Sequence, residues 1–271
     1  MSVPDFIYGT AWKEGATEGL VREALNAGFA AVDTANQRRH YHEQGVGDGL
    51  RAFLRESGKR REELFLQTKF TFADGQDHRK PYDERAPYAE QVRQSFESSL
   101  KHLGVDYLDS YLLHGPAGHG LGAADWEVWG AMTELLRSGK ARAIGVSNFD
   151  ARQLDALVAK AEVRPAFVQN RCYASRGWDR EVRALCRAKG IAYQGFSLLT
   201  ANVQELTKAP VRAIAQKHGK TLPQIAFRFS QQLGIIPLTG TTDAGRMRED
   251  LDIRSFSLSE DEVRTIEEIG G

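Results

Sequence analysis

Short runs of β-branched and aromatic residues alternate with longer amphipathic stretches along the whole chain. The short runs have the length of strands, and the longer stretches have the apolar spacing of helices. The pattern predicts strands over residues 6–10, 29–33, 64–69, 106–114, 141–147, 166–170, 191–196 and 234–239. It predicts helices over residues 17–27, 44–56, 87–102, 126–138, 150–160, 179–189 and 223–233.

Eight strands that alternate with helices favour a closed (β/α)8 TIM barrel over an open doubly wound sheet. No change of composition divides the chain, so residues 1–271 are expected to form a single α/β domain. Gly28 and Gly190 follow helical runs and precede strands, which is where a left-handed residue ends a helix. A long polar loop, residues 70–88, follows the third strand and is expected to lie over that end of the barrel.

Four polar residues stand at or just beyond the ends of predicted strands. Asp33, Lys69 and His114 each close an apolar run, and Tyr41 lies in the loop after Asp33. In a barrel of parallel strands these ends meet on one face, where such barrels carry their catalytic groups. The sequence therefore predicts an enzyme with a polar cluster at the mouth of the barrel.

Composition and charge exclude several classes of function. The chain is 41% hydrophobic and carries 36 basic and 36 acidic residues, which are interleaved rather than grouped. This balance favours neither nucleic acid nor an acidic membrane surface as a partner. No apolar stretch is long enough to span a membrane, and two cysteines are too few for a disulfide framework. A soluble cytoplasmic protein is expected.

The segments YGTAW, DTANQ, LFLQTKF, YLLHGP, IGVSNF, VQN, GFSLL and SLSEDEV together resemble the aldo-keto reductase family over nearly the whole chain. IGVSNF, residues 144–149, is the most specific of them. The resemblance implies reduction of carbonyl compounds by NADPH, the reverse oxidation of alcohols, and cofactor binding without a Rossmann domain. It also implies that the segment SLSEDEV begins a final helix.

The residue types suit that chemistry. Hydride addition leaves charge on the carbonyl oxygen, so a proton donor must reach that oxygen. Tyr41 is the expected donor, and a buried ammonium from Lys69 is expected to favour its phenolate by lowering a pKa that is normally about 10. Asp33 is expected to be the counterion of Lys69, and His114 to orient the carbonyl group. The alternative for Lys69 and Asp33 is an ordinary ion pair that closes the barrel.

One departure from the family concerns the tyrosine. The family pattern DTAxxYxNE would place Arg38 at the tyrosine position, and a guanidinium cannot act as an acid. We interpret the segment as having an insertion of three residues that moves the tyrosine to position 41. The altered spacing leaves an alternative function open: a catalytically weak dinucleotide-binding partner or redox-sensing protein on the same barrel.

The resemblance also implies the cofactor site. Amide and hydroxyl groups are expected to hold the nicotinamide carboxamide, Phe196 to stack on its ring, and two loops rich in small residues to bind the diphosphate. Relatives carry a lysine near Gly240 for the 2′-phosphate; here Arg246 is expected to bind it, so NADPH is preferred to NADH. The expected cofactor-binding residues are Thr10, Asp33, Ser147, Asn148, Gln169, Phe196, Ser197, Leu199, Gly240, Thr241, Thr242, Arg246, Glu249 and Asp250.

The substrate is expected to be a small carbonyl compound bound by a monomer. Its pocket is expected to be lined by Trp12, Phe70, Trp126 and His114, although such aromatic residues can equally belong to the core. The chain has a short C-terminal tail and begins almost at its first strand, so no N-terminal hairpin is expected, and the pocket should be open and broadly selective. His40 and His42 carry ring nitrogens that could bind a metal, but the further ligands of a zinc site are missing from the pattern, so no metal is expected.

Overall fold

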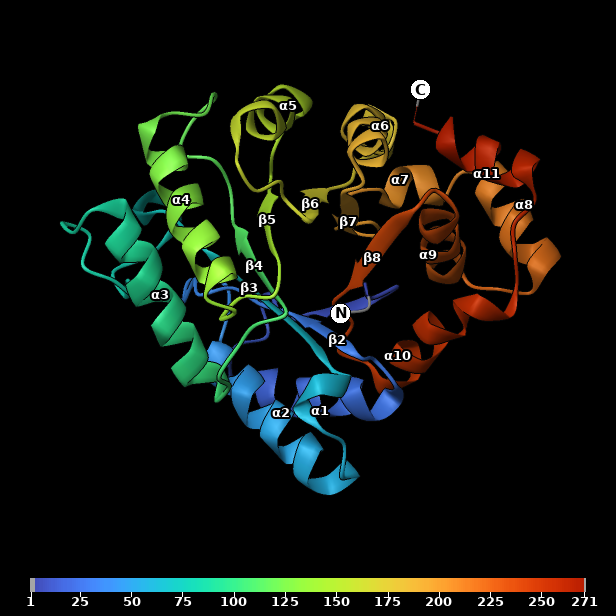
Figure 1. Cartoon of the computed structure of the whole chain (residues 1–271). Helices are drawn as coiled ribbons and strands as arrows, with labels where there is room; N and C mark the ends of the chain where they lie inside the picture. The colour runs from blue at the N-terminus through green and yellow to red at the C-terminus, as the bar shows by residue number, and fades with distance from the viewer. Residues whose placement is uncertain (1–2, 271) are drawn as a thin grey trace.

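The computed structural model describes residues 3–270, and its core is a closed barrel of eight parallel strands in the order β1 to β8 (Figure 1). Every strand of this part of the chain belongs to the barrel, so the predicted TIM barrel is confirmed. The strands are β1 (Ile7–Gly9), β2 (Ala31–Asp33), β3 (Phe65–Phe70), β4 (Ser110–Leu113), β5 (Ile144–Ser147), β6 (Phe167–Arg171), β7 (Ala192–Phe196) and β8 (Ile235–Thr239).

Helices surround the strands, and Figure 1 shows them as a ring in which α3 lies beside α4 and α11 lies beside α8. The helices at predicted positions are α1 (Thr17–Ala27), α2 (Glu43–Ser57), α3 (Tyr88–Leu103), α4 (Ala123–Arg137), α5 (Ala151–Lys160), α6 (Arg180–Lys189), α9 (Leu222–Gln232) and α11 (Glu260–Glu267). Three helices were not predicted from the sequence: α7 (Val203–Leu206), α8 (Ala209–His218) and α10 (Ala244–Leu251). No helix within residues 3–270 is long and apolar enough to cross a membrane.

Local signals explain the ends of the helices. Gly28 and Gly190 end α1 and α6 with φ angles of 118° and 69°, the left-handed region in which a side chain would be strained. The Asp150 side chain begins α5 by accepting a hydrogen bond from the backbone N–H of Gln153. The glycines end α1 and α6 directly before the next strands, and Asp150 sets the first residue of α5.

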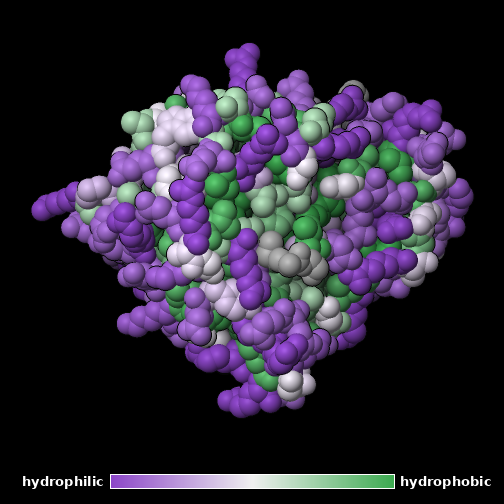
Figure 2. Space-filling view, in the orientation of Figure 1, coloured by the Kyte–Doolittle hydropathy of each residue, from purple (hydrophilic) through white to green (hydrophobic). Residues whose placement is uncertain are grey.

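The side chains that point into the barrel change character along its axis. The period of two along β3 turns Phe65, Gln67 and Lys69 to the same side. Phe65 belongs to an apolar cluster with Phe167 and Ile236, whereas Gln67 and Lys69 bond to other polar groups. The interior is therefore apolar near the strand starts and polar near the strand ends. The face shown in Figure 2 is largely hydrophilic at its rim, with apolar residues toward its centre.

Candidate active site

A buried ion pair joins the ends of β2 and β3. The Lys69 ammonium donates to both carboxylate oxygens of Asp33, at 2.6 and 2.7 Å, and to the carbonyl oxygen of Thr34 at 2.8 Å. Lys69 is fully buried and Asp33 is 3% exposed. Burial lowers the pKa of Lys69, and the charge and hydrogen bonds of Asp33 oppose that shift. The predicted pairing of these two residues is present at the predicted end of the barrel.

A layer of three glutamines supports this pair from inside the barrel. The amide groups of Gln67 and Gln169 both donate to Asp33 Oδ1, at 2.7 and 3.0 Å. Both also donate to Gln194 Oε1, and the Gln194 amide donates to Gln67 Oε1. Sequence analysis missed Gln67 and Gln194. Gln67 lies two residues before Lys69, and Gln194 lies two residues before Phe196. The period of two in a strand turns each glutamine to the same side as that predicted site residue, and this was the signal in the sequence.

The loop after β2 brings Tyr41 to the ion pair. The backbone N–H groups of His40 and Tyr41 both donate to the carbonyl oxygen of Gln37, which closes a tight turn. The Gln37 amide in turn donates to the carbonyl oxygen of Gly75 in the loop after β3. The centre of the Tyr41 ring lies 5.5 Å from Lys69 Nζ and 5.9 Å from the centre of the His114 ring. The longer loop therefore still places Tyr41 beside Lys69 and His114.

The pKa of Tyr41 shifts in the direction opposite to the expected one. Burial raises the pKa of its phenol, and the charge of Asp33 raises that pKa further. The Lys69 ammonium donates its three hydrogen bonds to Asp33 and Thr34. Within residues 3–270, Lys69 forms no hydrogen bond with the Tyr41 hydroxyl. The net shift of the Tyr41 pKa is therefore upward, opposite to the expected direction, and its phenol is protonated at neutral pH.

His114 follows β4 and is held in its neutral form. Its Nδ1 lies 2.7 Å from the hydroxyl oxygen of Thr71, which fixes the plane of the ring. Burial lowers the pKa of His114 to about 3, and the neighbouring charge of Lys69 contributes to that shift. A neutral imidazole beside a phenol can hydrogen-bond a carbonyl oxygen without adding charge to the site.

Polar residues after β5 and β6 offer hydrogen-bond acceptors. Asn148 donates its amide protons to His114 O and Ser147 Oγ, and Ser147 donates to Gln169 O. The side-chain oxygens of Asn148 and Gln169 accept no hydrogen bond from residues 3–270. Asn148 has a φ of 58°, a conformation that is strained outside glycine and typical of functional loops. These oxygens suit the amide protons of a nicotinamide carboxamide.

The other expected cofactor residues lie around the same face. Ser197 follows β7 with a φ of 57°, and Phe196 and Leu199 are half-buried beside it. Thr241 accepts a hydrogen bond from the Tyr8 hydroxyl through its carbonyl group, and Gly240 and Thr242 are exposed. The hydroxyl of Thr10 is fully buried and donates to Asp33 O.

A lysine that sequence analysis missed lies against this loop. Lys13, in the loop after β1, is 6% exposed and donates to the carbonyl oxygen of Gly240 at 2.6 Å. Burial lowers its pKa to about 8, and it forms no ion pair within residues 3–270. Because 227 residues separate Lys13 from Gly240, the sequence gives no local sign of this contact. The one hint was that Lys13 directly follows Trp12, a predicted pocket residue.

The residues of α10 divide between surface and interior. Arg246 and Glu249 are exposed, and no hydrogen bond within residues 3–270 involves the Arg246 guanidinium. Asp250 is 4% exposed and accepts a hydrogen bond from the Thr239 hydroxyl, and burial raises its pKa to about 6. Asp250 therefore bonds to the end of β8, and its role in cofactor binding stays an expectation.

The expected substrate residues also divide. Trp12 is 70% exposed and stacks on His40 with ring centres 3.9 Å apart. Trp126 is half-buried on α4 and packs against the core. Phe70 is fully buried, with its ring against Phe72 and Tyr82. Phe70 is therefore a core residue, and the expectation that it lines the pocket is wrong.

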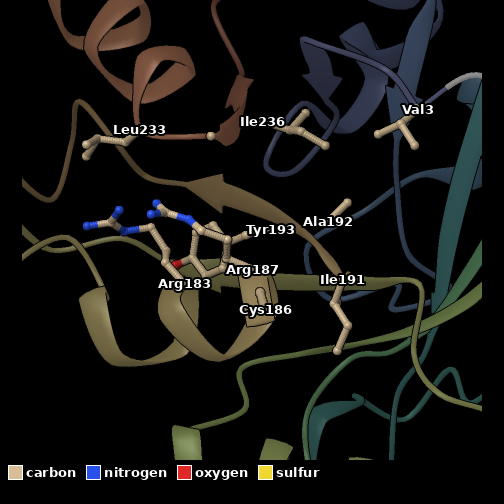
Figure 3. A pocket seen from close by; sticks show the side chains of 10 residues that line it. Val3, Arg183, Cys186, Arg187, Ile191, Ala192, Tyr193, Leu233 and Ile236 are labelled. Atoms are coloured by element: carbon tan, nitrogen blue, oxygen red, sulfur yellow. The ribbon is translucent and has the colours of Figure 1, made fainter. Parts of the chain in front are cut away.

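Two cavities lie at different ends of the barrel. One of about 530 Å³ lies beside Tyr41, between the loops after β1, β2 and β3. The other, of about 350 Å³, lies at the starts of β7 and β8, and Arg183, Tyr193, Val3 and Ile236 are among the residues that line it (Figure 3). None of the predicted site residues lines this second cavity.

Comparison with known proteins decides the family. The model of the Aldo/keto reductase family matches residues 10–270. The chain belongs to the aldo/keto reductase family. A glyoxal reductase from Bacillus subtilis is 34% identical to this aldo/keto reductase over 252 residues, which are 93% of this chain and 82% of the relative. An uncharacterized oxidoreductase from the same organism, YtbE, is 33% identical over 270 residues, covering 98% of this chain and 89% of the relative.

Solved structures agree with the sequence comparison. The aldo-keto reductase from Bombyx mori in complex with NADP superposes with a TM-score of 0.84 at 27% identity, over 99% of this chain and 90% of that one. An aldo-keto reductase from a deep-sea metagenome gives a TM-score of 0.85 at 26% identity, over 100% of this chain and 93% of that one. This aldo/keto reductase is thus an oxidoreductase of a family that uses a nicotinamide cofactor.

The residues present fit such a cofactor. The acceptor oxygens of Asn148 and Gln169 face no donor within residues 3–270, and Lys13 places a buried cation beside the loop after β8. Anions favour backbone N–H groups and cations of this kind. Within the same residues, no group of three or more metal-binding side chains lies close together.

Proposed function

We propose that this aldo/keto reductase reduces aldehydes or ketones to alcohols with NADPH, and that Tyr41 donates the proton. The observation that carries the proposal is the position of the Tyr41 ring beside both Lys69 and His114, despite the longer loop. Bound NADPH supplies the hydride for the carbonyl carbon. The chain must then hold the carbonyl group and protonate its oxygen.

Each residue of the cluster has a distinct role in this proposal. Tyr41 carries its proton throughout the neutral range because its pKa is raised, so the acid is always in the form that can donate. Neutral His114 hydrogen-bonds the carbonyl oxygen and sets its direction. As the proton leaves, the phenolate forms beside the Lys69 ammonium, which stabilises the developing charge in a site of low dielectric constant. Asp33 keeps that ammonium protonated.

The preference for NADPH follows from two cations. Lys13 is expected to bind phosphate oxygens next to Gly240, and Arg246 is expected to bind the 2′-phosphate with its unengaged guanidinium. Ser147, Asn148 and Gln169 are expected to hold the carboxamide. All of these groups come from one chain, so we expect a monomer to be active. The named relative that reduces glyoxal supports small reactive carbonyl compounds as first substrates to test.

The Tyr41→Phe variant tests the role of Tyr41. Removing a positioned general acid should lower kcat for glyoxal by roughly 10²- to 10⁴-fold. Turnover is followed by loss of the reduced-nicotinamide absorbance, and NADPH binding by quenching of protein fluorescence. The matched control is Tyr107→Phe, because the Tyr107 hydroxyl has no hydrogen-bond partner within residues 3–270 and lies outside the site. The control should keep wild-type turnover.

The same experiment separates the alternative function. If wild type and Tyr41→Phe both bind NADPH but neither reduces any of several reactive aldehydes, the protein is a dinucleotide-binding partner or sensor. If Tyr41→Phe retains most of the wild-type kcat, the protein is an enzyme but Tyr41 is not its acid.

A further inference from the structure

The cavity beside Tyr41 is lined by basic residues that the proposed chemistry does not use. Its volume is about 530 Å³. The longer loop after β2 supplies Arg38, Arg39 and His40 to its wall, and Arg79 from the loop after β3 joins them. The extra residues therefore do more than lengthen the connection to Tyr41, because they place guanidinium groups next to it.

Arg38 is anchored without being neutralised. Its Nη2 lies 3.0 Å from His102 Nε2, and a guanidinium can only donate, so this ring nitrogen accepts. The His102 proton must then sit on Nδ1, which donates to Glu43 Oε2 at 3.2 Å. Glu43 is buried and also accepts hydrogen bonds from the hydroxyls of Thr68 and Ser99. Arg38 thus bonds to a neutral imidazole and keeps its charge available.

Arg39 also lines the cavity, and its charge is available to a ligand. It forms no hydrogen bond or ion pair within residues 3–270, and its guanidinium is exposed. Burial lowers the pKa of the adjacent His40, and the charge of Arg39 lowers it further. By contrast, Arg79 is paired with Asp77. One carboxylate without a partner, Glu14, also lines the cavity.

The position of these arginines relative to Tyr41 is fixed by an aromatic contact. The backbone N–H of Trp12 donates to His40 O at 2.7 Å, and the two rings are in contact, with centres 3.9 Å apart and planes tilted by 39°. Gln37 Oε1 lies 2.8 Å from His40 Nδ1, which holds the ring from the other end. These contacts hold the turn in place before a ligand arrives, so little conformational entropy is lost when a ligand binds.

We propose that this cavity binds a carboxylate or phosphate group carried by the carbonyl substrate, so that the enzyme selects anionic aldehydes and ketones. The inference rests on the proposed function of Tyr41 as the proton donor. Guanidinium groups bind such anions through paired, charge-assisted hydrogen bonds, and they remain protonated at every relevant pH. Arg38 and Arg39 hold the charged end while the carbonyl end lies at Tyr41.

The test compares two aldehydes of similar size that differ in charge, 4-carboxybenzaldehyde and 4-methylbenzaldehyde. Wild-type kcat/KM should favour the carboxylate by at least roughly tenfold, since one charged hydrogen bond commonly contributes that much. In the variant with both Arg38→Gln and Arg39→Gln, kcat/KM for the carboxylate should fall roughly 10- to 100-fold more than for the methyl compound. Raising the salt concentration should reduce the wild-type preference, because screening weakens exposed charges.

The matched control is Arg164→Gln, which removes an exposed arginine that lies just before β6 and forms no ion pair within residues 3–270. It should leave kcat/KM unchanged for both aldehydes. Calorimetric titration with 4-carboxybenzyl alcohol and 4-methylbenzyl alcohol supplies a readout that needs no turnover. Tighter binding of the carboxylate, lost in the double variant, supports the subsite. Equal kcat/KM for the two aldehydes in wild type overturns the subsite and leaves the reductase intact. Equal losses for both aldehydes in the double variant also overturn it, because the arginines would then only support the loop.

Discussion

The two ends of the barrel differ in what their interior side chains do. At the strand ends, Lys69, Asp33 and the glutamine layer form a buried polar network in which most donors and acceptors are paired. At the strand starts, Phe65, Phe167 and Ile236 pack as apolar residues beside a cavity that no predicted site residue lines. The same strands thus contribute packing at one end and chemistry at the other.

The difference shows which end of the barrel carries the energetically unfavourable features of this protein. The buried ion pair of Lys69 and Asp33, the Tyr41 phenol with its raised pKa and the left-handed residues Asn148 and Ser197 lie at the strand ends. Such features persist only where the surrounding structure holds them in place. The apolar end supplies that stability, and substitutions at the two ends should therefore have different consequences.

The largest effect is expected from Lys69→Met. The variant leaves the Asp33 carboxylate buried without a cation, which should lower the free energy of unfolding by about 3–5 kcal/mol and abolish turnover. Urea unfolding measures the loss. The double variant Lys69→Met with Asp33→Asn should recover much of the stability but none of the activity. A single variant within about 1 kcal/mol of wild type would contradict the role of the pair.

At the opposite end, Ile236→Ala should separate stability from catalysis. Removing this buried side chain should cost about 2 kcal/mol, the lower end for such a change, because the residue already borders a cavity. The kcat/KM for glyoxal should stay within about twofold of wild type at a temperature where the variant is folded. A large fall in kcat/KM with an unchanged unfolding curve would remove the proposed division between the two ends.

A smaller effect is expected from Gln194→Met. The variant removes the second acceptor of the Gln67 and Gln169 amide groups, which keep their bonds to Asp33, and it also removes the donor to Gln67 Oε1. These losses should lower the free energy of unfolding by about 1–3 kcal/mol and weaken NADPH binding through Gln169. The control is Gln216→Met on the exposed face of α8, expected within about 0.5 kcal/mol of wild type. Denaturation and fluorescence titration are measured together. Equal stability of the two variants would show that the glutamine layer is not required.

The smallest effect concerns pH. The pKa of Lys13 is about 8, so its ammonium is charged at pH 7 and mostly neutral at pH 9. NADPH affinity should therefore fall by up to roughly tenfold as pH rises through this range. The Lys13→Met variant should bind NADPH weakly, with an affinity that does not change with pH over this range. Fluorescence titrations at several pH values provide the measurement. An identical pH dependence in the variant would exclude Lys13 as its source.

The barrel was largely predictable from the sequence because its strands are short apolar runs bounded by glycines and polar helices. The missed helices α8 and α10 have few buried residues, so their apolar pattern is weak. Phe70 was expected in the pocket as an aromatic residue near the mouth of the barrel. The period of two in β3 turns neighbouring side chains to opposite faces, so an inward Lys69 requires Phe70 to face the helices.

The candidate site was only partly predictable. The ion pair of Asp33 and Lys69 followed from their positions at strand ends. The place of Tyr41 depended on the turn at Gln37 and on its contact with Gly75, and a longer loop gives no local sign of either. The contact of Lys13 with Gly240 joins the first and last strands of the barrel and exists only once the barrel closes.

The sequence by itself determined the order of the eight strands, the family, and the arrival of Asp33 and Lys69 at the mouth of the barrel. These properties depend on local periodicity and on residue type, which a chain carries before it folds. Only the tertiary structure decided the protonation of Tyr41 and His114, the glutamine layer, and the unpaired arginines beside Tyr41. Those properties depend on burial and on the distances between groups from separate strands, which arise only when the barrel closes.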